Sequence, residues 1–376
     1  MSKSVYVVAG EVSGDTHGAA LMEALSDEWK DVKFRGLGGP AMCALAGPGM
    51  EDWVEDAAVM GFWEVMRRYG WFKERFDRAL AEILDFQPDV LLLIDYPGFN
   101  LRLAKQVAEL SPKTKIVQYV APQVWAWHQK RVPQIAKTHD LMICLFPFEV
   151  PIFEKAGLRA RCVGHPLVDE LEEKRIEVTP DPQLVGLFPG SRSREVGRLF
   201  PMMLEVVEIL HAGFPEVKFK TAAAGPRVEQ EMRDLLAKSG LPEGLIEIQS
   251  GDSQALMQSV CCGVVASGTA TLEAAYYGMP YCLVYQVAWP TYLLARHLVK
   301  LPHIGLTNIL AGREVVPEYI QNDANSYEVA GWIGTFLTDS VKRNKLREEL
   351  LETASRLGEI GVHRRAAHEI SLLFDS

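Results

Sequence analysis

The chain has 376 residues, of which 48% are hydrophobic and 23% are charged. This length is too great for one ordinary core and predicts two domains of a globular protein. The formal net charge of −10 argues against a nucleic-acid partner, which would favour a basic face.

The N-terminus carries an apolar run at residues 5–9 that ends at a glycine. The run is too short for the apolar core of a signal peptide and predicts a first β-strand. No stretch approaches the roughly 20 apolar residues that a membrane-spanning helix needs. The six cysteines form no C-x-x-C pair, so we expect reduced thiols in a cytosolic protein.

The first half of the chain alternates apolar runs with helical patterns. Such alternation predicts a mostly parallel sheet with helices on both faces. The expected strands are residues 4–8, 32–37, 90–94, 115–119 and 141–145, and the expected helices include 16–27 and 101–110.

A polar stretch at residues 170–182 is the expected linker, after which the alternation restarts. Two successive Rossmann-like domains follow from this pattern, at residues 1–172 and 183–345. Residues 346–376 form a helical segment, and the sequence leaves open whether it crosses back to the first domain. The expected strands of the second domain are 184–188, 218–222, 246–248, 262–265 and 281–284, and its helices include 198–211, 228–238 and 270–277.

Ligands of open α/β sheets bind beyond the carboxyl ends of the strands. The first strand is followed by Ser13, Gly14 and Asp15 at the start of a helix. Small residues and free N–H groups there suit an anion or a sugar hydroxyl. The alternative is an ordinary turn in which Ser13 or Asp15 caps the helix.

Asp95 ends the strand at residues 90–94. Burial there would raise its pKa, which suits a general base. The alternative is a capping role before Pro97.

The strand at residues 115–119 leads into a loop with Trp125, Trp127, His128 and Arg131. These side chains could line a sugar site or hold a phosphate. The alternative is a packed aromatic loop.

In the second half, the strand at residues 184–188 leads to Gly190, Ser191 and Arg192 at the start of a helix. Arginine opposes the helix dipole at this position, so another reason for its presence is needed. Binding a diphosphate is one such reason, because guanidinium groups pair with phosphate oxygens. The alternative is an ordinary surface arginine.

A second small-residue turn, Ser267, Gly268 and Thr269, follows the strand at residues 262–265. It opens a helix in the manner of a phosphate site. Glu273, one turn later, could bind both hydroxyls of a ribose. The alternative is a helix-capping motif.

Residues 60–76 alternate large apolar side chains with arginine and lysine. This composition suits a segment in a membrane interface, and the alternative is an amphipathic core helix. The expected membrane contacts are Phe62, Trp63, Met66, Trp71 and Phe72.

Taken in order, these motifs resemble the lipid-A-disaccharide synthase family, and the resemblance spans nearly the whole chain. The matching segments are AGEVSGD (9–15), GLGGPAM (36–42), VMGFWEV (59–65), PDVLLLIDYPGFN (88–100), VWAWHQKRV (124–132), LFPFE (145–149), VGHPLVD (163–169), FPGSRSREV (188–196), ASGTATLE (266–273) and LTNILAGREVVPEYIQ (306–321).

The resemblance implies an α/β fold of the GT-B type, with two Rossmann-like domains whose parallel sheets are flanked by helices. It also implies an inverting glycosyltransferase that joins UDP-2,3-diacylglucosamine to 2,3-diacylglucosamine 1-phosphate (lipid X). The product is the β(1→6) disaccharide 1-phosphate, and UDP is released. No metal or other cofactor is expected. The implied setting is cytoplasmic, at the inner face of the cytoplasmic membrane, with a homodimer as the suggested assembly.

On this basis the first domain takes the acceptor and the second takes the nucleotide. Asp95 would be the base or would orient it, and Arg192 would neutralise the diphosphate. The remaining expected nucleotide contacts are Ser191, Ser267, Gly268, Thr269, Glu273, Asn308 and Gln321, and the expected acceptor contacts are Ser13, Gly14, Asp15, Trp125, Trp127 and Arg131.

The sequence departs from the family pattern in four places: Ala121-Pro122-Gln123 stands for Ser-Pro-Ser, Tyr96 for Ala, Gly98 for a second Asp, and Thr307 for Pro. The departures bear on acceptor contacts more than on the reaction. Two other functions are compatible with the motifs. One is a UDP-sugar epimerase of similar architecture, and the other is a non-catalytic protein that binds lipid or nucleotide.

Overall fold

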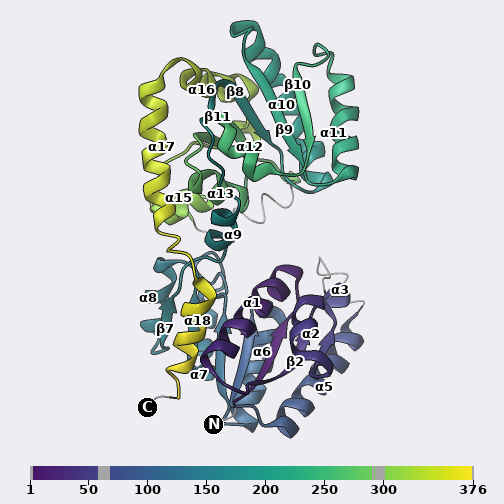
Figure 1. The fold of residues 1–376 in the computed structure, drawn as a ribbon, viewed down its shortest axis with the longest axis vertical. Helices are drawn as coiled ribbons and strands as arrows, with labels where there is room; N and C mark the ends of the chain where they lie inside the picture. The colour runs from purple at the N-terminus through teal and green to yellow at the C-terminus, as the bar shows by residue number, and fades with distance from the viewer. Residues whose placement is uncertain (1–2, 58–67, 290–291, 293–300, 375–376) are drawn as a thin grey trace. The chain divides into compact units, whose positions relative to one another are not determined.

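The structure is a computed structural model that describes residues 3–57, 68–289, 292 and 301–374 (Figure 1). The chain forms two compact units. The N-terminal unit comprises Met1–Pro166 and Glu359–Ser376, and the C-terminal unit comprises Leu167–Gly358. Each unit contains one parallel sheet, as the α/β fold class predicts.

The sheet of the N-terminal unit has seven strands in the order β3-β2-β1-β4-β5-β6-β7. Every neighbouring pair is parallel. The central strands consist almost entirely of buried apolar residues, which is expected where helices cover both faces. The strands are β1 (Ser4–Ala9), β2 (Lys33–Gly38), β3 (Met50–Asp52), β4 (Val90–Ile94), β5 (Lys115–Tyr119), β6 (Leu141–Cys144) and β7 (Ala160–Cys162).

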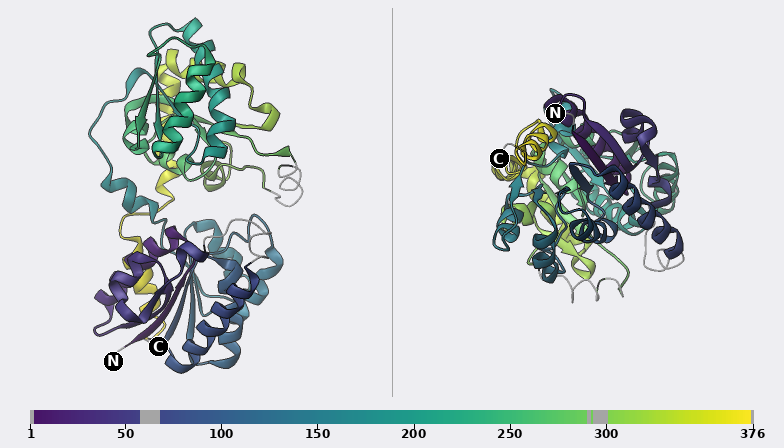
Figure 2. Two further views of the ribbon diagram at one scale, coloured as in Figure 1. Left: turned by 90° about the vertical axis from the view of Figure 1, so that its right-hand side faces the viewer. Right: turned by 90° about the horizontal axis from the view of Figure 1, so that it is seen from below.

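Helices flank this sheet on both sides (Figure 2). In one group α1 packs against α2 and α18, and in the other α6 packs between α5 and α7. The helices are α1 (Val12–Glu28), α2 (Pro40–Ala46), α3 (Val54–Ala57), α5 (Tyr69–Phe86), α6 (Pro97–Leu110), α7 (Val132–Thr138), α8 (Val150–Glu154) and α18 (Val362–Ser371).

The end of the chain belongs to the N-terminal unit. Helix α18 buries Val362, Ala366 and Ile370 along one face, at the spacing of an amphipathic helix. Beyond it, the ring of Phe374 packs edge-on against Trp29 and lies under the ammonium of Lys3. The two ends of the chain therefore lie in the same unit (Figure 1).

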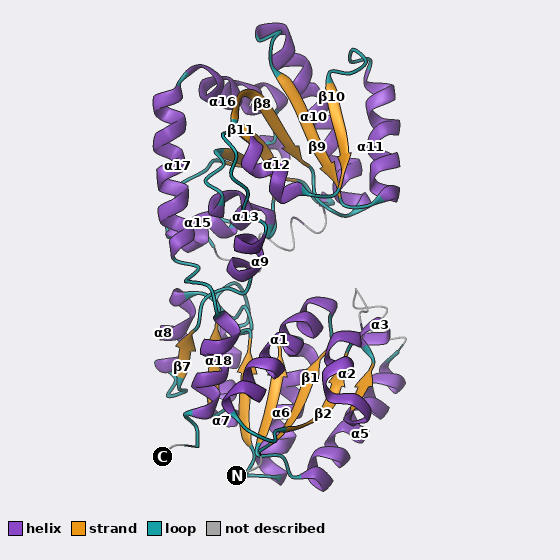
Figure 3. Cartoon of the chain, in the orientation of Figure 1, coloured by secondary structure: helices purple, strands orange, loops and turns teal. Residues whose placement is uncertain are grey.

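The sheet of the C-terminal unit has six strands in the order β10-β9-β8-β11-β12-β13, again all parallel (Figure 3). Helix α10 packs between α11 and α16, and α13 packs against α9, α15 and α17. The strands are β8 (Asp181–Phe188), β9 (Lys218–Ala223), β10 (Ile246–Ser250), β11 (Val260–Ala266), β12 (Tyr281–Tyr285) and β13 (Glu318–Ile320). The helices are α9 (Leu167–Glu173), α10 (Ser193–Gly213), α11 (Pro226–Ser239), α12 (Ser253–Ser259), α13 (Ala270–Tyr276), α15 (Leu306–Ala311), α16 (Ser326–Thr338) and α17 (Ser340–Ser355).

The boundaries of the units differ from those expected. The polar stretch expected as a linker begins within α9, and the first unit ends at Pro166 rather than at residue 172. Hydrogen bonds explain the shift, because the Tyr277 hydroxyl donates to the Leu171 carbonyl and Gln258 bonds with the backbone at Lys174 and Ile176. At the other end, residues 346–358 belong to the C-terminal unit, and only the chain from Glu359 returns to the first.

Candidate functional site

A pocket of about 480 Å³ opens at the carboxyl edge of the sheet in the C-terminal unit. It is formed by the segments that follow β8, β9, β10 and β11. This is the position at which doubly wound folds bind nucleotides. Six of the predicted nucleotide residues line it: Ser191, Arg192, Ser267, Gly268, Thr269 and Glu273.

The turn after β8 places Arg192 at the start of α10. Gly190 has a φ of 104°, and a Cβ atom there would lie 2.5 Å from an oxygen of Glu195, so the turn requires glycine. The Arg192 guanidinium pairs with Glu195 at 3.3 Å, yet its side chain stays 67% exposed. A cation so loosely held, at the N-terminus of a 21-residue helix, can reach an anion in the pocket.

The turn after β11 brings a carboxylate to the same pocket. Gly268 has a φ of 145°, which lets the chain turn from the strand into α13. Glu273 lies in that helix, where the amide of Gln254 donates to one of its oxygens at 3.1 Å. Burial raises the pKa of Glu273, because it removes water from the charged carboxylate. A pair of ribose hydroxyls could donate further hydrogen bonds to it.

One part of the pocket, which follows β9 and β10, contains no residue predicted from the sequence. This part consists of Ala222, Ala223, Ala224, Gly251, Asp252, Ser253 and Met257. Both strands were predicted, so the signal was available in the residues directly after each strand. Those residues are small or capping types, and nothing in their chemistry distinguishes them from an ordinary turn.

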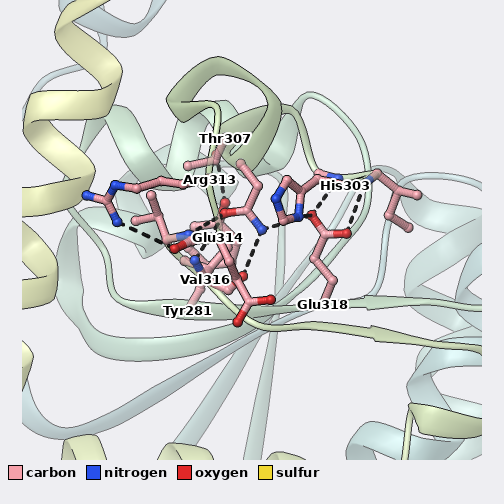
Figure 4. Close-up of polar contacts among 11 residues, drawn as sticks. Tyr281, His303, Thr307, Arg313, Glu314, Val316 and Glu318 are labelled. Atoms are coloured by element: carbon pink, nitrogen blue, oxygen red, sulfur yellow. Dashed lines mark hydrogen bonds and ion pairs between the residues drawn. The ribbon is translucent and has the colours of Figure 1, made fainter. Parts of the chain in front are cut away.

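Asn308 does not line the pocket and has a structural position instead. It is fully buried, and its amide nitrogen donates to the Val316 carbonyl and to Glu318, each at 2.8 Å. Its amide oxygen accepts from the backbone of Val315 and Val316. Glu318 in turn accepts hydrogen bonds from the backbone of Ile304 and Gly305 (Figure 4). Asn308 thus fixes the segments that lead into α15 and β13.

The side chain of Gln321 is likewise hydrogen-bonded to the backbone. Its side chain accepts from the amide of Val287 at 2.7 Å and donates to the carbonyl of the same residue at 3.1 Å. The residue has a φ of 56°. Gln321 therefore joins the chain after β12 to the chain after β13.

Thr307, one of the four departures, is also buried in the C-terminal unit. Its hydroxyl donates to the Thr271 carbonyl at 2.9 Å and accepts from the Tyr281 hydroxyl at 2.7 Å. It therefore connects α15 to α13, the helix that carries Glu273. Thr307 therefore has a structural position behind the helix whose Glu273 lines the pocket.

In the N-terminal unit, Asp95 stands at the carboxyl end of β4. Its φ is 44° and that of Tyr96 is 48°, so two consecutive non-glycine residues occupy the left-handed region. The amides of Asn100 and Gln118 hold the Asp95 carbonyl at 2.8 and 3.1 Å. Burial, assisted by the charge of Glu11, raises the pKa of the Asp95 carboxyl to about 6. A carboxyl with this pKa can act as a base near neutral pH.

Asp15 is occupied by the N-terminus of a neighbouring helix. It is buried, and its carboxylate accepts from the backbone of Gly39, Ala41 and Met42 at 2.8–3.0 Å. It therefore caps α2, while Ser13 is exposed and Gly14 is buried in the first turn of α1. The structure places the capping function on Asp15, as the alternative interpretation held, but toward α2 rather than toward its own helix.

The two tryptophans after β5 differ in their surroundings. The Trp125 indole donates to Glu149 at 3.0 Å, and burial raises the pKa of that carboxyl to about 7. Trp127 is 51% exposed and stacks on His128. Arg131 is exposed as well and lines a groove beside α6. Trp125 thus supports the loop, whereas Trp127 and Arg131 are free to contact a ligand.

The predicted membrane segment is described only from Arg68 onward, so Phe62, Trp63 and Met66 lie outside the described residues. Trp71 stacks on the buried Trp53 and packs against Phe72. Both side chains are half-buried against the core. For Trp71 and Phe72 the contacts agree with the alternative of an amphipathic core helix.

Two features are absent from the described residues. No helix there is long and apolar enough to cross a membrane. In the same part of the chain, no group of three or more histidine, cysteine or acidic side chains is arranged to hold a metal ion.

Solved structures with a similar fold include enzymes that act on UDP-sugars. UDP-GlcNAc 2-epimerase from Neisseria meningitidis, bound to UDP-GlcNAc, matches with a TM-score of 0.59 at 11% identity over 98% of this chain and all of that one. The calicheamicin glycosyltransferase CalG4 matches with a TM-score of 0.59 at 14% identity over 100% and 98%. Identities this low show a shared GT-B-type fold alone, so the epimerases do not favour the epimerase alternative.

The sequence comparisons are more specific. The family model for lipid-A-disaccharide synthetase matches residues 5–370. Lipid-A-disaccharide synthase of Trichlorobacter lovleyi is 38% identical over 97% of this chain and 96% of its own length. The enzyme of Persephonella marina is 35% identical over 99% of both. The resemblance seen in the motifs is confirmed, and the chain belongs to the lipid-A-disaccharide synthetase family.

Proposed function

We propose that this chain is the glycosyltransferase that makes the lipid A disaccharide. It joins UDP-2,3-diacylglucosamine to 2,3-diacylglucosamine 1-phosphate, forms the β(1→6) disaccharide 1-phosphate and releases UDP. The observation that carries the proposal is the family match over residues 5–370. The matched residues span both sheets and the pocket at the carboxyl edge of the sheet in the C-terminal unit.

The reaction inverts an α-linked donor to a β product and so needs one in-line displacement. The oxygen of the acceptor 6-hydroxyl bonds to the anomeric carbon as the bond from that carbon to UDP breaks. The hydroxyl proton passes to a base, and negative charge develops on the β-phosphate of UDP. The enzyme must therefore supply a base on one side and positive charge on the other.

Arg192 is the proposed source of that positive charge. It lines the pocket, is mostly exposed and has only Glu195 as an ion-pair partner among the described residues. When the diphosphate arrives, the guanidinium would leave Glu195 and pair with the phosphate oxygens. Ser267, Gly268 and Thr269 would donate to phosphate, and Glu273 would hold the ribose. Asn308 and Gln321 would support the nucleotide site indirectly, because they hold the loops beside β12 and β13.

Asp95 is the proposed base. Its pKa of about 6 leaves the carboxylate ionised at neutral pH while keeping it basic enough to take a proton. The backbone strain at Asp95 and Tyr96 supports this assignment, because such strain gathers at functional sites. Ser13, Trp127 and Arg131 are the exposed members of the proposed acceptor side.

The charge on UDP would be met without a metal ion, by Arg192 and the N-terminus of α10. This is testable by turnover in the presence of a chelator. A fall in turnover with EDTA that added Mg²⁺ restores would contradict it.

We also propose a peripheral site of action on the cytoplasmic face of the inner membrane, because both substrates carry acyl chains. Each buried CH₂ contributes about 0.8 kcal/mol to membrane retention. The test is sedimentation with anionic vesicles, using Phe62→Ser and Trp63→Ser. Release of these variants from the vesicles with unchanged UDP binding is expected, and retention of both on the vesicles would contradict a membrane role for the segment.

We also propose a homodimer, to be tested by the molar mass of the protein in detergent.

The deciding experiment is turnover with both acylated substrates in detergent, following UDP and disaccharide together. Equal amounts of UDP and disaccharide are the expected result. UDP binding without disaccharide would overturn the proposal and favour a non-catalytic binder. Conversion of a UDP-sugar in the absence of an acceptor would favour an epimerase.

A further inference from the structure

A groove of about 480 Å³ lies in the N-terminal unit between α5, α6 and α7. Its apolar lining includes Phe76 from α5, Leu101 from α6 and Ile135 from α7. Phe76 packs edge-on against Phe99, and Leu101 packs against the core cluster that contains Ile135. The floor of the groove is therefore apolar, and its side chains belong to or pack against two clusters of buried residues.

The charged side chains that line the groove are all basic. Arg102, Lys105 and Arg131 line it, and no acidic residue does. Within the described residues, the side chains of these three cations have no hydrogen-bond or ion-pair partner. The arginines of the neighbouring α5 differ, because Arg75 and Arg78 both pair with Glu51. Three unpaired cations beside one groove, in a chain of net charge −10, favour an anionic occupant.

The groove and the proposed base adjoin along the chain. Pro97 and Gly98 line the groove, and they follow Asp95 and Tyr96 directly in the sequence. Gly98, Arg102 and Lys105 are spaced at i, i+4 and i+7 and so lie on one face of α6. From Gly98 to Lys105 this face extends about 10 Å along the helix axis. A molecule in the groove can thus present one end toward Asp95 and an anionic group toward the cations.

We propose that this groove is the acceptor subsite, which holds the 1-phosphate of the acylated glucosamine on Arg102, Lys105 and Arg131 and rests an acyl chain on the apolar floor. The inference depends on the proposed function, because that function supplies the acceptor. The acceptor's 6-hydroxyl must reach the base, and its phosphate lies on the other side of the sugar ring. An anion site set along α6 from Asp95, with an apolar floor beside it, meets both requirements.

The test compares the acceptor with its dephosphorylated counterpart, each bound to the full chain in neutral detergent micelles without donor. The main variant carries Arg102→Gln, Lys105→Gln and Arg131→Gln. Wild-type protein is expected to prefer the phosphorylated lipid, and the variant to lose about tenfold or more of that preference. Binding of the dephosphorylated lipid should change little, because the floor is intact.

Two further variants complete the design. Lys137→Gln removes one charge from the exposed side of α7, outside the groove, and should bind like wild type. Gln134→Glu adds a carboxylate at an exposed position that lines the groove, and should weaken binding of the phosphorylated lipid alone. It serves as the second probe if the triple variant does not fold.

The outcomes separate the inference from the proposed function. Retention of the phosphate preference by both the triple variant and Gln134→Glu would overturn the subsite, even if wild-type protein makes disaccharide. The triple variant could instead lose binding to phosphatidylglycerol micelles while it keeps the preference for the phosphorylated acceptor. That result would also overturn the subsite, in favour of a membrane-lipid contact. Absence of disaccharide from wild-type protein would count against the proposed function instead, because the binding comparison needs no turnover.

Discussion

The ring of Tyr96 lies directly over Gly10, so that a Cβ atom at position 10 would be 2.5 Å from Cδ1 of the tyrosine. Two loops of the N-terminal unit meet at this contact, one after β1 and the other after β4. The tyrosine is fixed from its other sides by an edge-on contact with Trp53 and by a hydrogen bond from its hydroxyl to the Ala57 carbonyl. Because the residue next to it is Asp95, the contact bears on the proposed base.

We expect Gly10→Ala to lower the free energy of unfolding by about 1–3 kcal/mol, because the new methyl group overlaps the tyrosine ring. Thermal or urea unfolding measures this change. Tyr96→Ala installs the residue that the family pattern has at this position, and it removes the overlap. In that background Gly10→Ala should cost much less, and equal costs in the two backgrounds would show that the ring is not what excludes a side chain.

Arg192→Gln should weaken binding of UDP or of the UDP-sugar donor by about tenfold or more, since a charge-assisted contact to phosphate is lost. Its effect on folding should be small, because the ion pair with Glu195 is exposed. Isothermal titration with UDP measures the binding. Arg198→Gln is the matched control, since Arg198 is exposed on the same helix and does not line the pocket. Equal losses in the two variants would point to a general effect of charge and count against a specific contact.

Asn308→Ala should act first on stability. The substitution removes four hydrogen bonds at a fully buried position and leaves the amides of Val315 and Val316 without their acceptor. A loss of about 2–4 kcal/mol in the free energy of unfolding is expected. If unfolding is unchanged while UDP binding falls, Asn308 contacts the nucleotide directly and the structural interpretation is wrong.

Trp71→Ser should destabilise the N-terminal unit by about 2–4 kcal/mol, because the indole stacks on the buried Trp53. Tyr69→Ser is the comparison, since Tyr69 is 58% exposed in the first turn of the same helix and should change stability little. Thermal unfolding without vesicles measures both. A Trp71 variant as stable as wild type would return this side chain to the list of membrane contacts.

The central strands could be predicted from the sequence because each is a run of buried apolar residues with turn residues after it. The strands that escaped prediction, β3, β7 and β13, are the three-residue strands at sheet edges. Met50-Glu51-Asp52 and Glu318-Tyr319-Ile320 have no apolar run, and only their neighbours make them strands.

The same contrast holds at the site. The position of Arg192 and Glu273 at the pocket could be predicted, because each lies just beyond the end of a strand, and their contacts with a phosphate and a ribose stay predictions. Asp15 and Asn308 look alike from sequence, since each is a polar residue in a family motif. What separates them from ligand contacts is the set of backbone amides that they satisfy, and these belong to segments 7–27 residues away. Such partners follow from tertiary packing, which local pattern does not contain.

Asp95→Asn should reduce turnover by several orders of magnitude if the carboxylate takes the acceptor proton, and should leave UDP binding nearly unchanged. With a pKa of about 6, the carboxylate becomes ionised as the pH rises through that value. Wild-type kcat/KM should therefore increase from pH 5 to pH 7 and then level off. Turnover assays across this range measure the profile, and equal losses of turnover and UDP binding in the variant would defeat the assignment.

The stability of the protein should depend on pH in the opposite direction at this residue. Burial raises the pKa of Asp95 above its ordinary value of 3.8, so the fold favours the neutral carboxyl. Its contribution is complete below about pH 4 and is lost as the pH rises through about 6, to the extent of at most roughly 3 kcal/mol. Asp95→Asn keeps a neutral side chain and should unfold at a higher temperature than wild type at pH 7.5, with the difference vanishing near pH 4. An enzyme that gains stability when it loses this carboxylate maintains the charge for catalysis, whereas a variant less stable at both pH values would mean that the carboxylate is structural.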